Sequence, residues 1–220
     1  MKKIALLSIT LNAVNPMTSY LLSKPDITVV NYLDSYLGEK IKADGTINDE
    51  SMGRLLQMLT LACRDRADGI ILTCTVFSPY IEQFQKLCSV PIIGADAAMF
   101  DRVGKHGGST ALLCTFMATL APSKNQLAES YLRNGSEGTI EVFWLEDAYK
   151  ALQQQDLKNH NDYIIKQARL LDGCYDNIVL AQISMADAAA CLDLQKSRVF
   201  TSPQAAYELL LKRMEQEGIV

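Results

Sequence analysis

The sequence predicts an α/β protein made of two pseudo-symmetric halves, each a mostly parallel sheet flanked by helices. Three observations predict this fold in the 220-residue chain. Short apolar runs typical of buried strands alternate with longer amphipathic segments, and the whole pattern occurs twice. Strands that are apolar on both faces and alternate with helices form parallel sheets covered on both sides.

Eight apolar runs are expected to be strands. In chain order they cover residues 4–9, 27–31, 69–73, 91–93, 110–114, 140–144, 177–181 and 198–201. The first run follows two lysines, as in a signal peptide, but it is short and no convincing cleavage site follows. We therefore interpret it as a strand and expect a cytoplasmic protein. The clearest helix covers 50–67, where apolar residues recur at three- and four-residue spacing and Asn48 is placed to cap the first turn.

An internal duplication organises these elements. Residues 4–8 are echoed by 110–114, residues 68–74 by 176–182, and residues 94–98 by 202–206, so the offset stays between 106 and 108. We expect one half to comprise 1–98 with 205–220, and the other 99–204. Ligands of open parallel sheets bind outside the carboxyl ends of the strands. The site is therefore expected in the cleft between the halves.

Composition excludes several classes of function. The chain is 49% hydrophobic and 21% charged, with a net charge of −4 and no cluster of basic residues, which argues against a nucleic-acid partner. No apolar run approaches the roughly 20 residues that cross a bilayer. The six cysteines form no Cys-x-x-Cys pair and no Cys/His zinc spacing, so we expect no metal site.

Residues just after the expected strands are the site candidates. Cys74 lies between two threonines directly after the run 69–72 and ahead of an expected helix, where backbone N–H groups favour a thiolate. The alternative is an inert, buried thiol. Thr115 and Thr119 follow the equivalent strand of the second half and can hold a small carboxylate, or one of them can cap a helix. Ser8 and Asn12 are expected to face the same cleft.

The remaining cysteines and histidines are expected to be structural. Cys63 and Cys88 are placed on helix faces, and Cys191 in an alanine-rich helix, so all three should pack in cores. His106 is expected in a connecting loop beside Gly107 and Gly108, and His160 in the polar stretch 153–162, both of them solvated. Neither histidine has a strand-end position, which ranks a thiol hydrolase last, because its cysteine would need a histidine to activate it.

Four short motifs resemble the aspartate/glutamate racemase family, which includes hydantoin racemase, maleate isomerase and arylmalonate decarboxylase. They are Thr-Cys-Thr at 73–75, Cys-Thr-Phe-Met-Ala-Thr-Leu-Ala at 114–121, Leu-Ala-Gln-Ile-Ser-Met-Ala at 180–186 and Thr-Ser-Pro at 201–203. The resemblance covers nearly the whole chain. It implies cofactor-independent chemistry at the α carbon of a small carboxylic acid, and a two-domain fold that is commonly a homodimer or a higher homo-oligomer.

One departure from the family pattern bears on the mechanism. Racemases of this family place one cysteine on each side of the substrate carbon, whereas this chain has Cys74 in the first half and Gln182 at the equivalent place in the second. The resemblance implies a racemase or isomerase in which Cys74 is the acid/base and Gln182 orients the substrate. Thr75 would bind the carboxylate with Thr115 and Thr119.

Several alternatives stay open because glutamine cannot act as a general base near neutral pH. Ser184, two residues after Gln182, is expected to contact the substrate and can relay a proton, although an unassisted hydroxyl is a poor base. A one-thiol decarboxylase and a cis-trans isomerase of the same superfamily are alternatives. A third is a non-catalytic protein that binds a small carboxylate.

Overall fold

The computed structural model describes residues 1–219 of the chain. These residues divide into two compact units. The first combines residues 1–95 with the segment from Pro203 onward, and the second is Asp96–Ser202. The sequence placed the two boundaries after residues 98 and 204.

The first unit is built on a four-stranded parallel sheet with the order β2-β1-β3-β4. The strands are β1 (Lys2–Ser8), β2 (Ile27–Leu33), β3 (Gly69–Leu72) and β4 (Ile92–Gly94). The central strands β1 and β3 are almost completely buried from Ile4 and Gly69 onward, whereas the edge strand β2 is mostly half-buried. This pattern explains why β1 and β3 are apolar on both faces.

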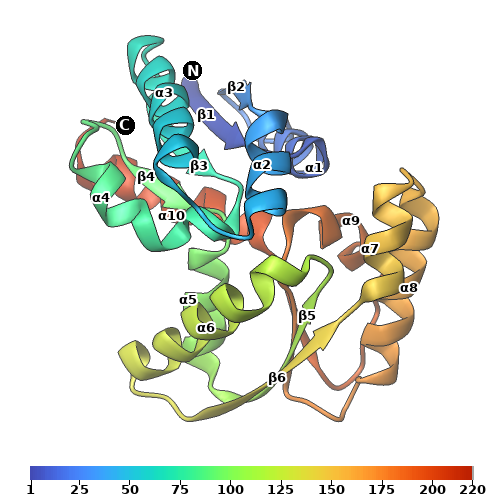
Figure 1. The fold of residues 1–220 in the computed structure, drawn as a ribbon. Helices are drawn as coiled ribbons and strands as arrows, with labels where there is room; N and C mark the ends of the chain where they lie inside the picture. The colour runs from blue at the N-terminus through green and yellow to red at the C-terminus, as the bar shows by residue number, and fades with distance from the viewer. Residues whose placement is uncertain (220) are drawn as a thin grey trace. The chain divides into compact units, whose positions relative to one another are not determined.

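Helices cover both faces of this sheet (Figure 1). The face formed by Ala5, Leu7 and Ile70 packs against α2 (Ser35–Asp44), α3 (Asp49–Arg64) and α4 (Ile81–Gln85). The opposite face carries α1 (Leu11–Leu22) and α10 (Ser202–Gln216), whose Leu210 side chain lies against Gly69. The Asn48 side chain accepts a hydrogen bond from the Ser51 N–H at 3.0 Å, which confirms the expected helix cap.

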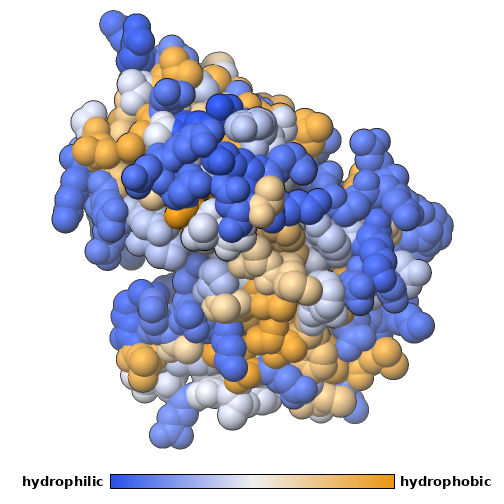
Figure 2. Space-filling view, in the orientation of Figure 1, coloured by the Kyte–Doolittle hydropathy of each residue, from blue (hydrophilic) through white to orange (hydrophobic). Residues whose placement is uncertain are grey.

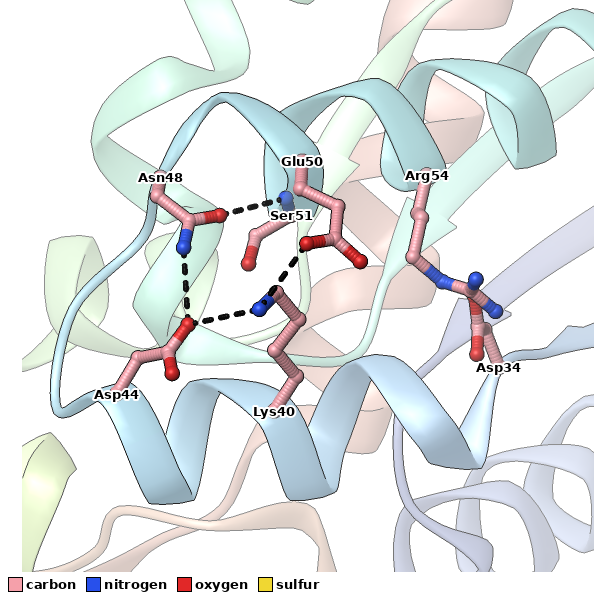
Figure 3. Close-up of polar contacts among 7 residues, drawn as sticks. All are labelled: Asp34, Lys40, Asp44, Asn48, Glu50, Ser51 and Arg54. Atoms are coloured by element: carbon pink, nitrogen blue, oxygen red, sulfur yellow. Dashed lines mark hydrogen bonds and ion pairs between the residues drawn. The ribbon is translucent and has the colours of Figure 1, made fainter.

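A polar network joins α2 to the first turns of α3 (Figure 3). The Lys40 ammonium lies 3.1 Å from both Asp44 and Glu50, and the Asn48 amide donates to Asp44. One turn further along α3, Arg54 donates to Asp34, the residue that caps α2. Exposed ion pairs contribute little singly, so we assign this network the role of fixing how α2 and α3 lie together.

The second unit repeats the first. Its parallel sheet has the order β6-β5-β7-β8. The strands are β5 (Gly108–Cys114), β6 (Gly138–Trp144), β7 (Asn177–Leu180) and β8 (Arg198–Phe200). All eight expected strands are therefore present, and their ends differ from the expected ones by at most two residues. The two-unit α/β fold with parallel sheets is confirmed.

Helices again cover both faces of the second sheet. One face packs against α7 (Glu146–Gln153), α8 (Leu157–Leu170) and α9 (Ala186–Ala189), and the other carries α5 (Ala97–His106) and α6 (Leu120–Asn134). Figure 2 shows hydrophilic side chains over α7 and α8, and apolar ones gathered over β5 and β6. On the edge strand β6, Trp144 remains 38% exposed.

The duplication extends to individual hydrogen bonds. In the first unit, the Asp68 carboxylate before β3 accepts the N–H of Lys3 at 2.7 Å. In the second, the Asp176 carboxylate before β7 accepts the N–H of Ser109 at the same distance. Both carboxylates satisfy the backbone at the start of the neighbouring strand. An internal duplication explains this match better than chance similarity between apolar strands does.

Two helices are exchanged along the chain between the units. Helix α5 follows β4 but belongs to the second unit, whereas α10 follows β8 and belongs, after its first residue, to the first. Within the second unit, α5 and α6 approach closely at Gly104, because the Ser130 hydroxyl fills the place of a Cβ there. Within residues 1–219, no helix is long and apolar enough to cross a membrane.

Candidate active site

The carboxyl end of β3 positions Cys74 in the first unit. Cys74 has an extended backbone (φ −111°, ψ 117°) and is followed by a 3₁₀ helix over Thr75–Tyr80. Its side chain is half-buried at the margin of the apolar core, and Thr75 is buried. The helix expected after Cys74 is therefore a six-residue 3₁₀ turn followed by the short α4, so its dipole is weaker than that of a full α-helix.

Two hydroxyls meet beside this strand end. Ser8, at the end of β1, is fully buried, and its Oγ lies 2.8 Å from the Oγ1 of Thr73. Thr73 belongs to the Thr-Cys-Thr motif but was not among the site residues expected from the sequence, although a polar residue directly after a buried apolar strand is a usable signal. Asn12 is the second residue of α1 and is half-buried. The first unit thus supplies a thiol, three hydroxyls and an amide from the carboxyl side of β1 and β3.

Gln182 occupies the equivalent place in the second unit. It follows β7 as Cys74 follows β3, has a similar extended backbone (φ −109°, ψ 147°) and also precedes a 3₁₀ helix, Ile183–Met185. Ser184 lies in that helix and is half-buried. The correspondence of positions 74 and 182 within their units therefore holds at the level of backbone conformation.

A hydrogen-bond network holds the Gln182 side chain. Its Oε1 accepts the Thr115 N–H at 2.7 Å and lies 3.3 Å from the Thr115 hydroxyl, while its Nε2 donates to Thr119 Oγ1 at 2.8 Å. Both threonines are almost fully buried, at 1% and 3% exposure. The Thr119 hydroxyl donates to the Phe116 carbonyl at 2.6 Å and makes no capping bond to α6. The helix-cap alternative is therefore wrong for Thr119.

Cys114 lies next to this network at the end of β5. Its side chain is fully buried. Burial raises the pKa of the Cys114 thiol to about 11. Near neutral pH the group is a neutral thiol. A buried thiol that keeps its proton is a poor general base.

Three residues differ from the expectations for structural side chains. His160, expected in a solvated segment, is fully buried in α8 with its Nδ1 2.9 Å from the Ala148 carbonyl oxygen. Cys191, expected in a helix core, is exposed because α9 ends at Ala189. Cys88 lies in the turn after α4 and not on a helix face, although it does pack against the core.

The strand ends of the two units therefore carry different functional groups. The first provides a half-buried thiol among hydroxyls, and the second an amide with a fixed orientation. Thiols and hydroxyls can move protons, while amide and backbone N–H groups stabilise negative charge. Among residues 1–219, no group of three His, Cys, Asp or Glu side chains is arranged to hold a metal ion.

Comparison with known proteins gives a consistent picture. Residues 12–210 match the family model described as Asp/Glu/Hydantoin racemase. None of the curated proteins matches the chain significantly. Among solved structures, the chain is similar in fold to the aspartate racemase of Picrophilus torridus (TM-score 0.71, 14% identity, 98% of this chain and 95% of that one).

Two further structures show the same fold. The allantoin racemase of Klebsiella pneumoniae has a TM-score of 0.65 and 14% identity, over 98% of this chain and 89% of that one. The glutamate racemase of Campylobacter jejuni subsp. jejuni has a TM-score of 0.67 and 14% identity, over 96% and 85%. At such low identity these likenesses describe the fold and leave the substrate open.

Proposed function

We propose, since the chain belongs to the Asp/Glu/hydantoin racemase family, that it racemises or isomerises a small carboxylic acid at its α carbon without a cofactor, using Cys74 as the acid/base. The observation that carries this proposal is the pair of equivalent strand ends, one with a half-buried thiol and the other with an amide in a fixed orientation. In this proposal both strand ends act on one substrate.

Cys74 transfers the proton in the proposed reaction. Its thiolate takes the α proton, and the electron pair of the broken C–H bond moves into the substrate carboxyl group as an enolate. Cys74 lies after the central strand β3, on the side where parallel sheets bind ligands. The thiol that results can return the proton to the same carbon.

Gln182 acts in this scheme as a hydrogen-bond donor. Its Oε1 is occupied by Thr115, and one N–H of its Nε2 by Thr119, so the side chain is held before substrate arrives. Donors whose positions are fixed in advance stabilise developing negative charge without reorganisation. Thr115 and Thr119 would contribute mainly by holding Gln182, while Ser8, Asn12, Thr75 and backbone N–H groups bind the carboxylate.

Return of a proton to the opposite face is the step that a Cys/Gln pair performs least well. Ser184 or a water molecule would have to deliver it, and neither is a strong acid. The fixed Gln182 side chain therefore favours one-sided reactions as the second candidate, namely decarboxylation or cis-trans isomerisation at a single thiol. A protein that binds a carboxylate without turnover is the remaining alternative.

Exchange of the α proton in D₂O tests the proposal. Amino acids, hydroxy acids and hydantoins are incubated with the protein, and deuterium incorporation is followed by NMR. We expect at least one compound to exchange, Cys74→Ala to abolish the exchange, and Cys174→Ala, which changes an exposed thiol, to preserve it. The proposal fails if Cys74→Ala exchanges as fast as the unmodified protein.

A second variant tests whether positions 74 and 182 serve one carbon. Gln182→Cys restores a thiol on the second side, so we expect it to increase racemisation relative to one-sided exchange, as measured by chiral chromatography. A substrate acid should also protect Cys74 from iodoacetamide. If some acids bind by calorimetry but none exchanges, isomerises or loses carbon dioxide, the protein is a binder and not an enzyme.

The proposal includes a cytoplasmic location and a homodimer or higher homo-oligomer, with a small carboxylate as the partner molecule. Closed homodimers are the commonest form of soluble oligomeric proteins. Light scattering coupled to size-exclusion chromatography measures the mass directly. A value at the 24.3 kDa of one chain would contradict this part.

A further inference from the structure

Two cysteines outside the candidate site lie with their sulfur atoms in contact. Cys63, near the end of α3, and Cys88, in the turn after α4, have their Sγ atoms 2.7 Å apart across 25 residues of sequence. A disulfide has an S–S distance of about 2.05 Å. The two sulfurs therefore need to move less than an ångström to form a bond, within one unit of the molecule.

The turn that carries Cys88 is held in place by a neighbouring side chain. The Gln85 amide donates to the carbonyls of Cys88 and Val90, and its Oε1 accepts the N–H of Ile92 at 2.8 Å. On the other side, Cys63 belongs to the sixteen-residue helix α3, whose start is capped by Asn48. Both thiols are half-buried and pack against the same apolar core. The pairing is thus fixed by two ordered elements and does not rest on a mobile loop.

The two thiols of the pair are not equivalent. Burial, together with the hydrogen bond to Cys63, raises the pKa of Cys88 to about 12, so Cys88 keeps its proton near neutral pH. A protonated Cys88 can donate its S–H to the sulfur of Cys63. We therefore take Cys63 as the sulfur that reacts first and Cys88 as the thiol that follows.

We propose that Cys63 and Cys88 are a redox-active pair that a peroxide converts into a reversible disulfide. In the first step, the Cys63 sulfur attacks one peroxide oxygen, the O–O bond breaks, and a sulfenic acid and water form from hydrogen peroxide. In the second step, the Cys88 sulfur attacks the sulfenic sulfur, the S–OH bond breaks, and the hydroxide leaves as water with the Cys88 proton. The two thiols lose two electrons, and the peroxide gains them.

The experiment uses the full-length protein and hydrogen peroxide. Reduced protein is treated with peroxide, remaining thiols are blocked with iodoacetamide, and a digest is made without reductant. We expect mass spectrometry to find a peptide pair joined through Cys63 and Cys88, two hydrogens lighter than the separate peptides. Dithiothreitol should return both peptides to their alkylated forms.

Variants separate the specific pair from general oxidation. Cys63→Ser and Cys88→Ser should each abolish the joined peptide, whereas changing the exposed Cys174 and Cys191 to serine should preserve it. In Cys88→Ser, dimedone should label a sulfenic acid at Cys63. The proposal is overturned if peroxide oxidises Cys174 and Cys191 while Cys63 and Cys88 remain alkylatable. That result is obtained with the protein that carries no substitution, so it stands even if a variant does not fold.

This proposal is independent of the proposed function. Its readout is a covalent link in the first unit and requires no substrate or turnover. Disulfides are rare in reducing compartments except as transient or sensing bonds. If the cytoplasmic location is right, a reversible bond of that kind is the form expected here.

Discussion

Replacing Gln182 with leucine removes the acceptor that satisfies a buried backbone group. The Gln182 Oε1 lies 2.7 Å from the Thr115 nitrogen, and Thr115 is only 1% exposed. Leucine has nearly the same size but no polar atom, so the Thr115 N–H loses its partner while remaining shielded from water. The change therefore tests whether this side chain is fixed by the network or merely rests near it.

The expected cost follows from the groups left without partners. A buried donor without a partner costs about 1–3 kcal/mol. The Thr119 hydroxyl also loses the Nε2 donor but keeps its bond to the Phe116 carbonyl at 2.6 Å, so it adds little. We expect Gln182→Leu to reduce the free energy of unfolding of the second unit by about 1–3 kcal/mol.

The protein contains a natural probe for this measurement. Trp144 is the only tryptophan, it lies in the second unit, and it pairs with Cys114 in the sheet, next to the Gln182 network. Urea unfolding followed by its fluorescence therefore reports on the second unit. The matched control is Gln153→Leu, an exposed position at the end of α7, where we expect a change within about 0.5 kcal/mol.

The reasoning is refuted if the two leucine variants unfold at the same urea concentration. That outcome would mean that the Thr115 N–H finds water or another acceptor at no cost, and that Gln182 is not fixed before substrate arrives. The proposed role of Gln182 as a donor with a fixed orientation would then lose its support.

Two further predictions concern the scaffold. Gly104→Ala should destabilise the second unit by about 1–3 kcal/mol, because a Cβ there would lie 2.2 Å from the Ser130 hydroxyl and 2.8 Å from its carbonyl oxygen. Its control Gly53→Ala, in α3 with open space around the Cβ, should stabilise the first unit by about 0.5–1 kcal/mol. If both variants shift the melting temperature in the same direction, the packing argument is contradicted. The hydrogen bond from Arg54 holds the pKa of Asp34 below its ordinary value, so the stability it contributes is present above about pH 4 and is lost as the pH falls below that. Asp34→Asn should therefore reduce the loss of unfolding free energy between about pH 4 and pH 2. Urea unfolding at a series of pH values measures this loss, and an equally large loss in the variant would count against this ion pair.

The fold could be predicted from the sequence because the duplication is visible in short apolar runs that recur in both halves. Apolar runs marked each strand, and the nearly constant offset between the two sets of runs identified the equivalent ends, including positions 74 and 182. The helix cap at Asn48 was also predictable, since it depends only on neighbours three residues away. Features with local causes were the ones that sequence reasoning found.

Features that depend on pairing across the sheet were not predictable. The bond between Gln182 and the Thr115 backbone joins residues 67 apart, and it requires the register of β5 against β7. Composition also misled at His160, whose surrounding segment is polar. Its spacing of four from Ile164, and of four more to Ala168, places it on the buried face of α8. Helical periodicity was the signal that could have found it.

The exchange of α5 and α10 affects how the protein is made. A ribosome releases residues 1–95 long before the last helix, yet Leu210 and Met214 of that helix are completely buried. The first unit therefore keeps one apolar surface uncovered until the second unit and α10 have been synthesised. In this molecule the domain that begins first is the one that is completed last.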